Sequence, residues 1–489
     1  MTQPTRPLNR PDLLRDACFI DGKWLKASDG SSIPVNNPAT GATICSVPKL
    51  GRKETEQAIA SAQAALPGWS AKTGKERAII LQKWAQLMMD NQQDLAVIMT
   101  SEQGKPVAEA AGEIAYAASF LEWFGEEAKR IDGDILQSPK AGQRLMALKQ
   151  PIGVCAAITP WNFPAAMITR KVGPALAAGC TMVVKPAQQT PLTALALAVL
   201  AEEAGVPAGV FHVITGGSRD IGGALCESDV VRKLSFTGST EVGRTLMAQC
   251  APTIKKLSLE LGGNAPLIVF DDADLDRAVD GILASKYRNA GQTCVCANRI
   301  YVQSGIYEDV LARLVEKVKA MKVGDGFAEG VTQGPLIDEA AIAKIQEHIA
   351  DAVAHGGKVV AGGKPHALGG TFFEPTIVRD ATQEMRFATE ETFGPVAPLF
   401  RFDNEKEVIA MANDTIFGLA AYFFTRDYAR IWRVSEALEY GIVGINTGII
   451  SNEVGPFGGV KQSGLGREGS KYGIEEYLEM KYLCVDLGE

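Results

Sequence analysis

The spacing of apolar positions divides the chain into a helical first part and a long region of alternating strands and helices. Between residues 52 and 130, apolar residues recur every three or four positions, which predicts helices that bury one face. Residues 131–150 break into short extended pieces, which favour a hairpin arm. Residues 477–485 alternate weakly, and we expect them to pair with that arm or with another subunit.

Strands and helices alternate after the arm. The predicted units are strand 153–158 with helix 167–178, strand 181–184 with helix 191–204, strand 211–214 with helix 221–225, and strand 231–236 with helix 240–249. Because these strands are largely apolar, they predict a parallel sheet covered on both faces. A second α/β segment is predicted from strand 266–270, helix 274–289, helix 306–322 and a strand near 444–446.

Bulk composition adds few constraints beyond fold class. With 489 residues, 46% of them hydrophobic and 22% charged, the chain is expected to form two or three globular domains. The net charge of -8 argues against nucleic acid or an anionic membrane surface as a partner. No apolar run approaches a membrane span of about 20 residues, and residues 1–21 lack the apolar core of a signal peptide.

Cysteines and histidines point to a reducing environment without a metal. The nine cysteines show no framework spacing, which suits the cytoplasm better than secretion. The four histidines do not pair with cysteines at metal-ligand spacing, so we expect no metal site.

Three short segments carry candidate chemistry. Cys294 follows Gly291, whose lack of a side chain lets the backbone approach a ligand. Glu260 precedes Gly262 and Gly263, a pair that suggests close backbone packing. Asn162 lies in the segment 159–164. Taken singly, these residues would more often be a small buried side chain, a solvated carboxylate and a turn residue.

The position of a bound phosphate is predicted from strand and helix ends. The match to Gly-x-Gly-x-x-Gly at 464–469 has no buried strand before it and too little chain after it, so we reject it. In segment 236–243 a strand ends in Gly238 and Ser239 just as a helix begins, which favours a phosphate. An ordinary capped helix would look the same. Lys185 lies where another strand leaves the sheet, the usual ligand crevice of such folds.

The segments around Asn162, Glu260 and Cys294 together resemble the aldehyde dehydrogenase superfamily, and the similarity runs from residues 19–24 to 473–478. The resemblance implies an α/β fold with a Rossmann-type parallel-sheet cofactor domain, an α/β catalytic domain and a small β oligomerisation arm. The implied dinucleotide-binding domain spans 1–131 and 152–258, the catalytic domain 259–471, and the arm 132–151 and 472–489. A homodimer or homotetramer is implied by analogy.

The resemblance also gives roles to residues. Cys294 would attack the aldehyde, the Asn162 amide and the Cys294 N–H would stabilise the oxyanion, and Glu260 would activate the water that hydrolyses the thioester. Glu391 would hold the nicotinamide ribose, and Phe393 would pack beside the ring. The full set of implied cofactor-binding residues is Thr159, Pro160, Trp161, Lys185, Ala187, Gln188, Gly238, Ser239, Gly243, Leu261, Glu391 and Phe393.

Cofactor preference depends on position 188. By resemblance, a glutamate there would bind both ribose hydroxyls of NAD and repel the 2′-phosphate of NADP. Neutral Gln188 removes that repulsion and Lys185 supplies a counter-charge, so we expect NADP to be preferred. Alternatively, Gln188 hydrogen-bonds the ribose of NAD.

Four residues resemble the carboxylate pocket of the family members that oxidise succinic semialdehyde: Arg170, Arg288, Ser451 and Phe457. Arginine suits this role because its planar fork binds carboxylates bidentately, although either arginine could instead form an ordinary ion pair. The implied substrate is a carboxylated aldehyde, succinic semialdehyde first and glutaric semialdehyde next, with 4-aminobutyrate breakdown as the natural pathway. A CoA-acylating enzyme or a non-catalytic protein are the rival classes. Cys296 is expected to be a packing residue rather than a disulfide partner of Cys294.

Overall fold

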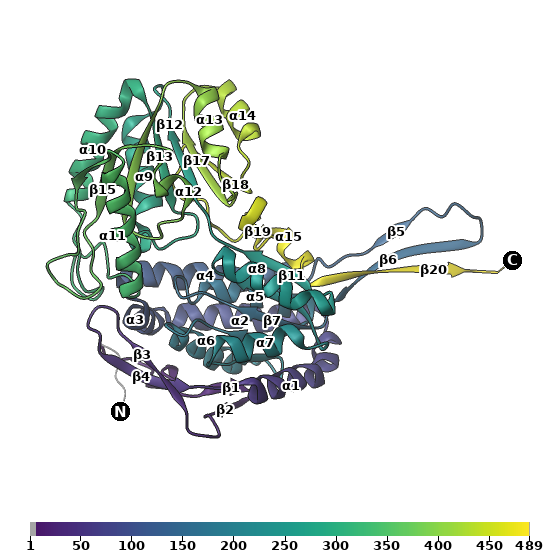
Figure 1. The fold of residues 1–489 in the computed structure, drawn as a ribbon. Helices are drawn as coiled ribbons and strands as arrows, with labels where there is room; N and C mark the ends of the chain where they lie inside the picture. The colour runs from purple at the N-terminus through teal and green to yellow at the C-terminus, as the bar shows by residue number, and fades with distance from the viewer. Residues whose placement is uncertain (1–5, 489) are drawn as a thin grey trace.

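The molecule has two lobes and an arm that projects from one of them (Figure 1). The computed structural model describes residues 6–488. The first five residues of the predicted cofactor domain and the last residue of the predicted arm therefore lie outside the described residues.

The first lobe is built on an eight-stranded sheet that confirms the predicted alternating units. Its strand order is β19 (Gly464–Leu465), β11 (Lys256–Glu260), β10 (Val231–Thr237), β7 (Val154–Ile158), β8 (Thr181–Lys185), β9 (Phe211–Val213), β1 (Cys18–Ile20) and β2 (Lys23–Leu25). The strands from β11 to β9 are parallel, whereas β1, β2 and β19 join antiparallel. The short strands β1 and β2, and the separate hairpin of β3 (Ser32–Asn36) and β4 (Thr43–Pro48), were not predicted.

Helices cover both faces of this sheet. They are α1 (Arg52–Ser70), α2 (Gly74–Asp90), α3 (Gln92–Gln103), α4 (Val107–Glu127), α5 (Ala166–Ala178), α6 (Pro191–Ala204), α7 (Ser218–Glu227) and α8 (Thr240–Cys250). Alternate residues of β7 enter different apolar cores: Cys155 packs with one cluster and Val154 with the other. This alternation is why the central strands are apolar throughout.

The second lobe holds a seven-stranded sheet. Its order is β14 (Lys358–Ala361), β15 (Thr376–Ala381), β16 (Val396–Phe402), β13 (Ala297–Gln303), β12 (Ala265–Val269), β17 (Ala420–Phe424) and β18 (Ile442–Ile445). Its helices are α9 (Leu275–Lys286), α10 (Tyr307–Lys319), α11 (Glu339–Ala354), α12 (Arg386–Thr389), α13 (Glu405–Asn413) and α14 (Tyr428–Ala437). The predicted helix 274–289 ends earlier than expected, at Lys286, and a left-handed turn follows it.

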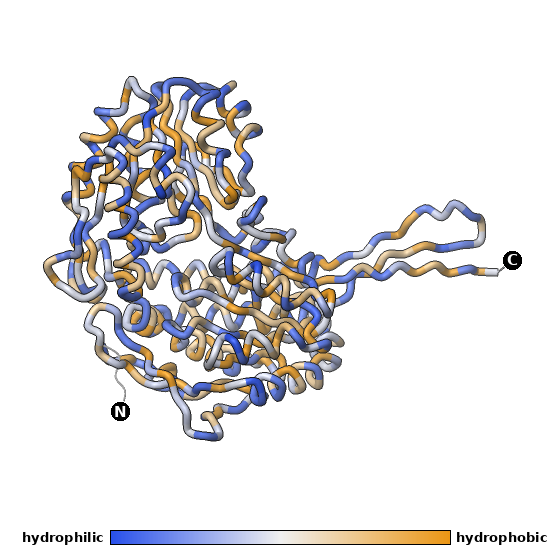
Figure 2. Tube along the Cα trace, in the orientation of Figure 1, coloured by the Kyte–Doolittle hydropathy of each residue, from blue (hydrophilic) through white to orange (hydrophobic). Residues whose placement is uncertain are grey.

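The predicted arm is a three-stranded antiparallel sheet of β5 (Asp134–Leu136), β6 (Gln143–Pro151) and β20 (Leu478–Asp486). β20 pairs with β6 of the same chain along its whole length, from Leu478 opposite Pro151 to Asp486 opposite Gln143. Polar and apolar residues alternate along the projecting ribbon (Figure 2).

The two lobes are joined at the first sheet's edge. The predicted domain boundary after residue 258 falls within β11, and β19, from the segment predicted to be catalytic, pairs antiparallel with β11. The rejected glycine motif therefore begins in an edge strand, and the short helix α15 (Ser470–Glu475) that follows packs on α4 and α5.

Two features are missing from residues 6–488. No helix there has the length and apolar character needed to cross a membrane. Nor does that part of the chain bring together three or more histidine, cysteine, aspartate or glutamate residues that could hold a metal ion.

Candidate active site

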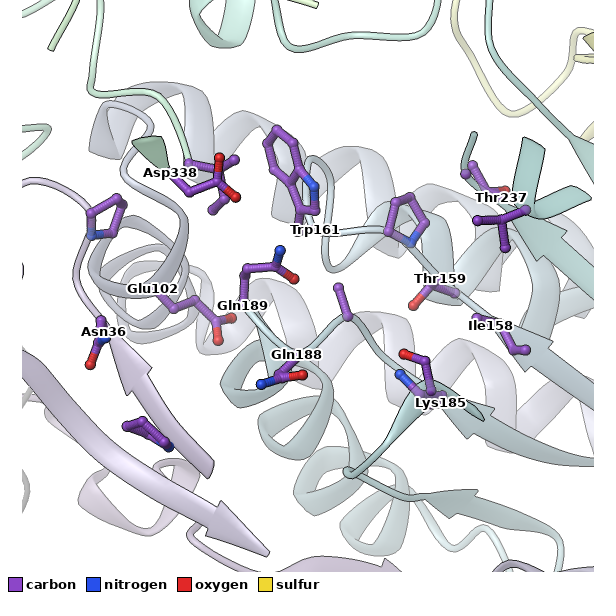
Figure 3. Close-up of a pocket in the computed structure, with 18 of the residues that line it drawn as sticks. Asn36, Glu102, Ile158, Thr159, Trp161, Lys185, Gln188, Gln189, Thr237 and Asp338 are labelled. Atoms are coloured by element: carbon purple, nitrogen blue, oxygen red, sulfur yellow. The ribbon is translucent and has the colours of Figure 1, made fainter. Parts of the chain in front are cut away.

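A cavity of about 800 Å³ opens at the carboxyl ends of β7 and β8, where ligands bind in parallel α/β sheets. Figure 3 shows Lys185 and Gln188 on one side of it, with Trp161 and Asp338 on another. The predicted cofactor-binding residues that line it are Thr159, Pro160, Trp161, Lys185, Ala187, Gln188 and Gly238.

Polar atoms in this cavity have unused hydrogen-bonding capacity. Lys185 ends β8, and its ammonium donates one hydrogen bond, to the Pro186 carbonyl at 3.3 Å. Burial lowers the pKa of Lys185 to about 8, so an anionic ligand here would stabilise its charged form. Among the described residues, the buried Thr159 hydroxyl has no partner. These residues fit a dinucleotide, which would supply the missing partners.

The start of α8 lies beside the same cavity. Ser239 caps the helix by accepting a hydrogen bond from the Val242 N–H at 3.3 Å, as in an ordinary capped helix. Gly238 lines the cavity, but Gly243 does not line any of the cavities that hold the other predicted residues. A Cβ on Gly243 would lie 2.4 Å from Leu261, so its small size serves helix packing.

A second cavity, of about 360 Å³, lies between the lobes and shares Pro160, Trp161 and Gly238 with the first. The predicted residues that line it are Pro160, Trp161, Asn162, Gly238, Ser239, Glu260, Leu261, Cys294, Glu391 and Phe393. The rings of Trp161 and Phe393 meet edge to face, 5.6 Å apart. The structure thus brings the three predicted catalytic residues together at the inner end of the cofactor cavity.

Glu260, the last residue of β11, is buried rather than solvated, since only 3% of it is exposed. Neither carboxylate oxygen has a hydrogen-bond partner among the described residues. Burial, and then the charge of nearby Glu468, raise the pKa of Glu260 well above its usual value. A raised pKa makes the ionised Glu260 carboxylate a stronger base, which is the property that proton removal from water requires.

The Gly262–Gly263 pair packs closely against the nucleophile loop, as predicted. A Cβ on Gly263 would lie 2.5 Å from the Cys294 carbonyl oxygen. The Gly263 N–H donates to a Glu391 carboxylate oxygen at 3.2 Å, and burial raises the pKa of Glu391 to about 7. Any side chain at Gly263 would push apart the segments that carry Glu260 and Cys294.

Cys294 follows a tight turn at Gly291, where we predicted a close approach of the backbone to a ligand. Gly291 has φ of +74°, and a Cβ there would lie 2.2 Å from the Gly394 carbonyl, so its close neighbour is backbone rather than a ligand. Cys294 is partly exposed, and burial raises the pKa of its thiol to about 12. The thiol therefore needs a base before it can attack. The Asn162 amide donates to the Gln292 carbonyl at 3.1 Å, which ties the Asn162 segment to the segment that carries Cys294.

A third, much smaller cavity of about 20 Å³ lies on the other side of Cys294. Its lining includes all four predicted substrate-binding residues: Arg170, Arg288, Ser451 and Phe457. Its volume holds roughly one water molecule, so a substrate must shift side chains as it enters.

The two arginines of this cavity have different partners. Arg170 is buried, and its Nε lies 3.0 Å from a Glu468 carboxylate oxygen, so the ordinary ion pair considered from the sequence is present. Within the described part of the chain, Arg288 forms no ion pair and instead stacks over the Phe163 ring at 5.3 Å. Arg288 is therefore not held in an ion pair, although the Glu109 carboxylate lies close enough to interact with its charge.

Sequence reasoning missed several residues around these cavities. Tyr116 and Phe163 line the small cavity, and Glu468 pairs with both Arg170 and Lys171. Glu468 lay within the rejected glycine motif, and Tyr116 lay in a segment interpreted only as helical. Neither position carried a local signal, because both meet the site through tertiary packing.

Cys296 is buried, and its thiol lies 3.4 Å from the Lys286 carbonyl. All nine cysteines are free. These contacts are those of a packing residue.

Comparison with known proteins agrees with this geometry. The sequence model that describes the "Aldehyde dehydrogenase family" matches residues 24–483 of this chain. The chain belongs to the aldehyde dehydrogenase family. One relative of this aldehyde dehydrogenase is the glutarate-semialdehyde dehydrogenase of Pseudomonas aeruginosa, 66% identical over 97% of this chain and 98% of the relative. Another is the NADP(+) succinate-semialdehyde dehydrogenase of Escherichia coli K12, 65% identical over 98% of this chain and 100% of the relative.

The fold of this aldehyde dehydrogenase also matches solved structures of the family. The crystal structure of an aldehyde dehydrogenase from Brucella melitensis biovar abortus 2308 is 64% identical and covers 99% of this chain and 100% of its own, with a TM-score of 0.98. The predicted family and α/β fold class are confirmed.

Proposed function

We propose that this enzyme oxidises succinic semialdehyde to succinate and uses NADP in preference to NAD. The observation that carries the proposal is the position of Cys294, which lines both the inner cofactor cavity and the small cavity with Arg170 and Arg288. An aldehyde held at Cys294 would then have its far carboxylate at the arginines and its reacting carbon toward the cofactor.

The chain's own groups provide the chemistry on either side of the oxidation. The Cys294 thiol passes its proton to the Glu260 carboxylate, which releases it to solvent, and the thiolate attacks the aldehyde carbon. The Asn162 amide and the Cys294 N–H stabilise the resulting oxyanion. When bound, the oxidised dinucleotide supplies a hydride acceptor. Glu260 then takes a proton from water, which attacks the Cys294 thioester and releases the acid. A buried base beside the nucleophile favours hydrolysis over transfer to CoA.

Two relatives with almost equal identity act, by their names, on aldehydes that differ by one methylene. One methylene typically changes selectivity by about 1–3 kcal/mol. Glutaric semialdehyde is therefore the alternative main substrate. Because the small cavity is so confined, we favour the shorter acid.

The remaining assignments belong to the same proposal. We assign residues 1–131 and 152–258 to cofactor binding, 259–471 to catalysis, and 132–151 with 472–489 to a homo-oligomer interface, either dimer or tetramer. Nine free cysteines suit the cytoplasm, where thiols stay reduced.

The test is the absorbance of reduced cofactor formed from each semialdehyde, with NADP and NAD at equal concentrations. We expect the highest kcat/KM with succinic semialdehyde and NADP, with no acceleration by CoA. A higher kcat/KM for glutaric semialdehyde would make that aldehyde the main substrate. A higher kcat/KM with NAD would make NAD the preferred cofactor. No oxidation of either aldehyde would reject the function.

A further inference from the structure

The end of helix α3 reaches two of the three segments that carry the proposed catalytic residues, those of Asn162 and Cys294. Gln103 is its last residue, and Lys105 follows after Gly104, whose φ is +93°. A Cβ on Gly104 would lie 2.7 Å from Pro335 and 2.9 Å from Pro38, so this turn is tightly enclosed. The enclosure fixes the direction in which Gln103 and Lys105 leave the helix.

The backbone carbonyl of Asn162 accepts two hydrogen bonds, one from the turn after α3 and one from the segment before Cys294. Lys105 Nζ donates one at 2.8 Å, and Asn289 Nδ2 donates the other at 2.9 Å. These bonds use both lone pairs of the carbonyl oxygen. The peptide plane of Asn162 is therefore held from two sides.

Asn289 is fixed on the nucleophile segment by its backbone and by its side chain. Its φ is +51°, followed by Ala290 at +54° and Gly291 at +74°, a left-handed run that non-glycine residues rarely adopt. Its side-chain oxygen accepts from Gln103 Nε2 at 2.9 Å, and its Nδ2 also donates to the Gln292 carbonyl at 3.3 Å. Asn289 thus links α3, the Asn162 segment and the loop before Cys294.

Lys105 is buried and balanced by a buried partner. Its ammonium pairs with Glu113 on α4, whose other oxygen accepts from the Ala165 N–H at 2.9 Å. That N–H precedes α5, the helix that follows the Asn162 segment. A buried ion pair is costly to desolvate and contributes little net stability, which suggests a purpose beyond folding.

We propose that Lys105 and Asn289 are positioning residues that hold the Asn162 amide where it stabilises the oxyanion formed at Cys294. The inference rests on the proposed function, in which Asn162 is an oxyanion donor. A displacement of about 1 Å in such a group can cost roughly 100-fold in rate. Neither residue lines the cavities around Cys294, so they act through Asn162.

The main variant is the double substitution Lys105→Met with Glu113→Gln. It removes the bond to the Asn162 carbonyl without leaving an unpaired buried charge, and glutamine can still accept from the Ala165 N–H. Asn289→Asp is a second, independent variant that tolerates the left-handed turn but loses the donor Nδ2. The matched control is Lys255→Met, because Lys255 is also buried and bonded to two backbone carbonyls, those of Ser228 and Val231.

Two reactions of Cys294 separate positioning from folding. Aldehyde oxidation passes through an oxyanion, whereas alkylation by iodoacetamide does not. We expect the first-turnover rate of cofactor reduction to fall about 10- to 100-fold in both network variants. In both variants, the rate of Cys294 alkylation and the KM for the aldehyde should stay within about threefold of the wild-type values. Lys255→Met should keep the wild-type first-turnover rate.

A double-mutant cycle with Asn162→Ala tests the route of the effect. If Lys105 acts through the Asn162 amide, adding Lys105→Met and Glu113→Gln to Asn162→Ala should cause little further loss. Unchanged first-turnover rates, or equal losses of oxidation and alkylation, would overturn the inference. The wild-type protein distinguishes the two proposals, because its failure to oxidise either semialdehyde would reject the proposed function instead.

Discussion

The environment of Cys294 favours the protonated form of its thiol. Burial raises the pKa of the thiol to about 12, while Arg170 and Arg288 act in the opposite direction. Thiolate is the attacking form, so a raised pKa slows the reaction of the resting thiol with electrophiles. Cys296, two residues away, is buried and lines neither of the two cavities at Cys294.

Substitution of Cys294 therefore gives the most direct test at this scale. Cys294→Ala should abolish cofactor reduction, because no thioester can form. The matched Cys296→Ala variant removes the neighbouring thiol and should keep kcat within about threefold, since it deletes a packing sulfur outside the cavities. Steady-state absorbance measurements of both variants decide the point, and residual oxidation by Cys294→Ala would disprove the mechanism.

The two arginines of the small cavity predict different mutant phenotypes. Arg288→Ala should raise KM for succinic semialdehyde at least tenfold and leave KM for butanal nearly unchanged, because a hydrogen bond to a charged group contributes about 1.5–3 kcal/mol. Arg170→Ala should in addition lower the melting temperature, because it breaks a buried pair with Glu468. Equal changes in KM for both aldehydes in Arg288→Ala would contradict the carboxylate pocket.

The raised pKa of Glu391 predicts pH-dependent cofactor binding. A carboxyl group with a pKa of about 7 is mostly protonated below that pH, so the proposed acceptance of ribose hydrogen bonds by Glu391 weakens as pH falls. The Kd for NAD, which lacks a 2′-phosphate that would itself titrate, should rise up to about tenfold between pH 8 and 6. Calorimetry of Glu391→Gln should lose this rise and keep only the opposite dependence from Lys185, whose pKa of about 8 makes it more fully charged as pH falls. An equal rise in that variant would assign the titration elsewhere.

At the scale of elements, the proposed preference for NADP depends on the crossover from β8 to α6. Lys185 ends the strand and Gln188 lies before the helix, both on the cofactor cavity (Figure 3). Glu102, from α3, accepts hydrogen bonds from the Leu192 and Thr193 N–H groups at 2.7 and 2.8 Å. The first N–H groups of α6 are thus already used, which leaves Lys185 as the charged donor for a 2′-phosphate.

Gln188→Glu should consequently reverse the cofactor preference. A carboxylate at this position can accept from both ribose hydroxyls of NAD and repels a 2′-phosphate, so kcat/KM should fall at least tenfold with NADP and rise with NAD. Gln189→Glu, one residue further on the same crossover, is the matched control for added charge. If both variants change the ratio of kcat/KM with NADP to kcat/KM with NAD equally, the effect comes from the added negative charge and not from position 188.

Sequence patterns predicted the structure best where the residues of a single strand or helix are enough to identify it. The apolar strands β7 and β8 and the helices that follow them were predictable because both faces of each strand are buried. The strands β1 to β4 were missed, since they are short and lie at or near sheet edges. The left-handed turn at Asn289 could not be predicted either, because a non-glycine residue is held there by bonds to Gln103 and Asn162, which are distant in sequence.

At the scale of the whole molecule, the arm is the feature that a single chain does not explain. Its three strands project away from the lobes (Figure 1) and expose apolar side chains, including Ile135 at 87% and Met480 at 65%. Monomeric proteins rarely keep extended apolar ribbons in solvent, and an uncovered sheet edge invites association. From the sequence, residues 477–485 could pair either with the arm or with another subunit. In the structure they form β20, which pairs with β6 of the same chain. The other surfaces of the arm are therefore available to a second copy.

The arm should therefore hold the oligomer together. The double substitution Met480→Asp with Tyr482→Asp places two charges on exposed positions of β20 and should release monomers of 52.1 kDa in sedimentation experiments. Tyr428→Asp is the control, because Tyr428 is 73% exposed and begins α14 in the second lobe, whereas the arm projects from the first (Figure 1). A mass unchanged by the arm substitutions would assign assembly to another surface, and a wild-type monomer would reject the predicted oligomer. Because Cys294, Glu260 and Asn162 all belong to one chain, we expect any folded monomer to retain measurable oxidation of succinic semialdehyde.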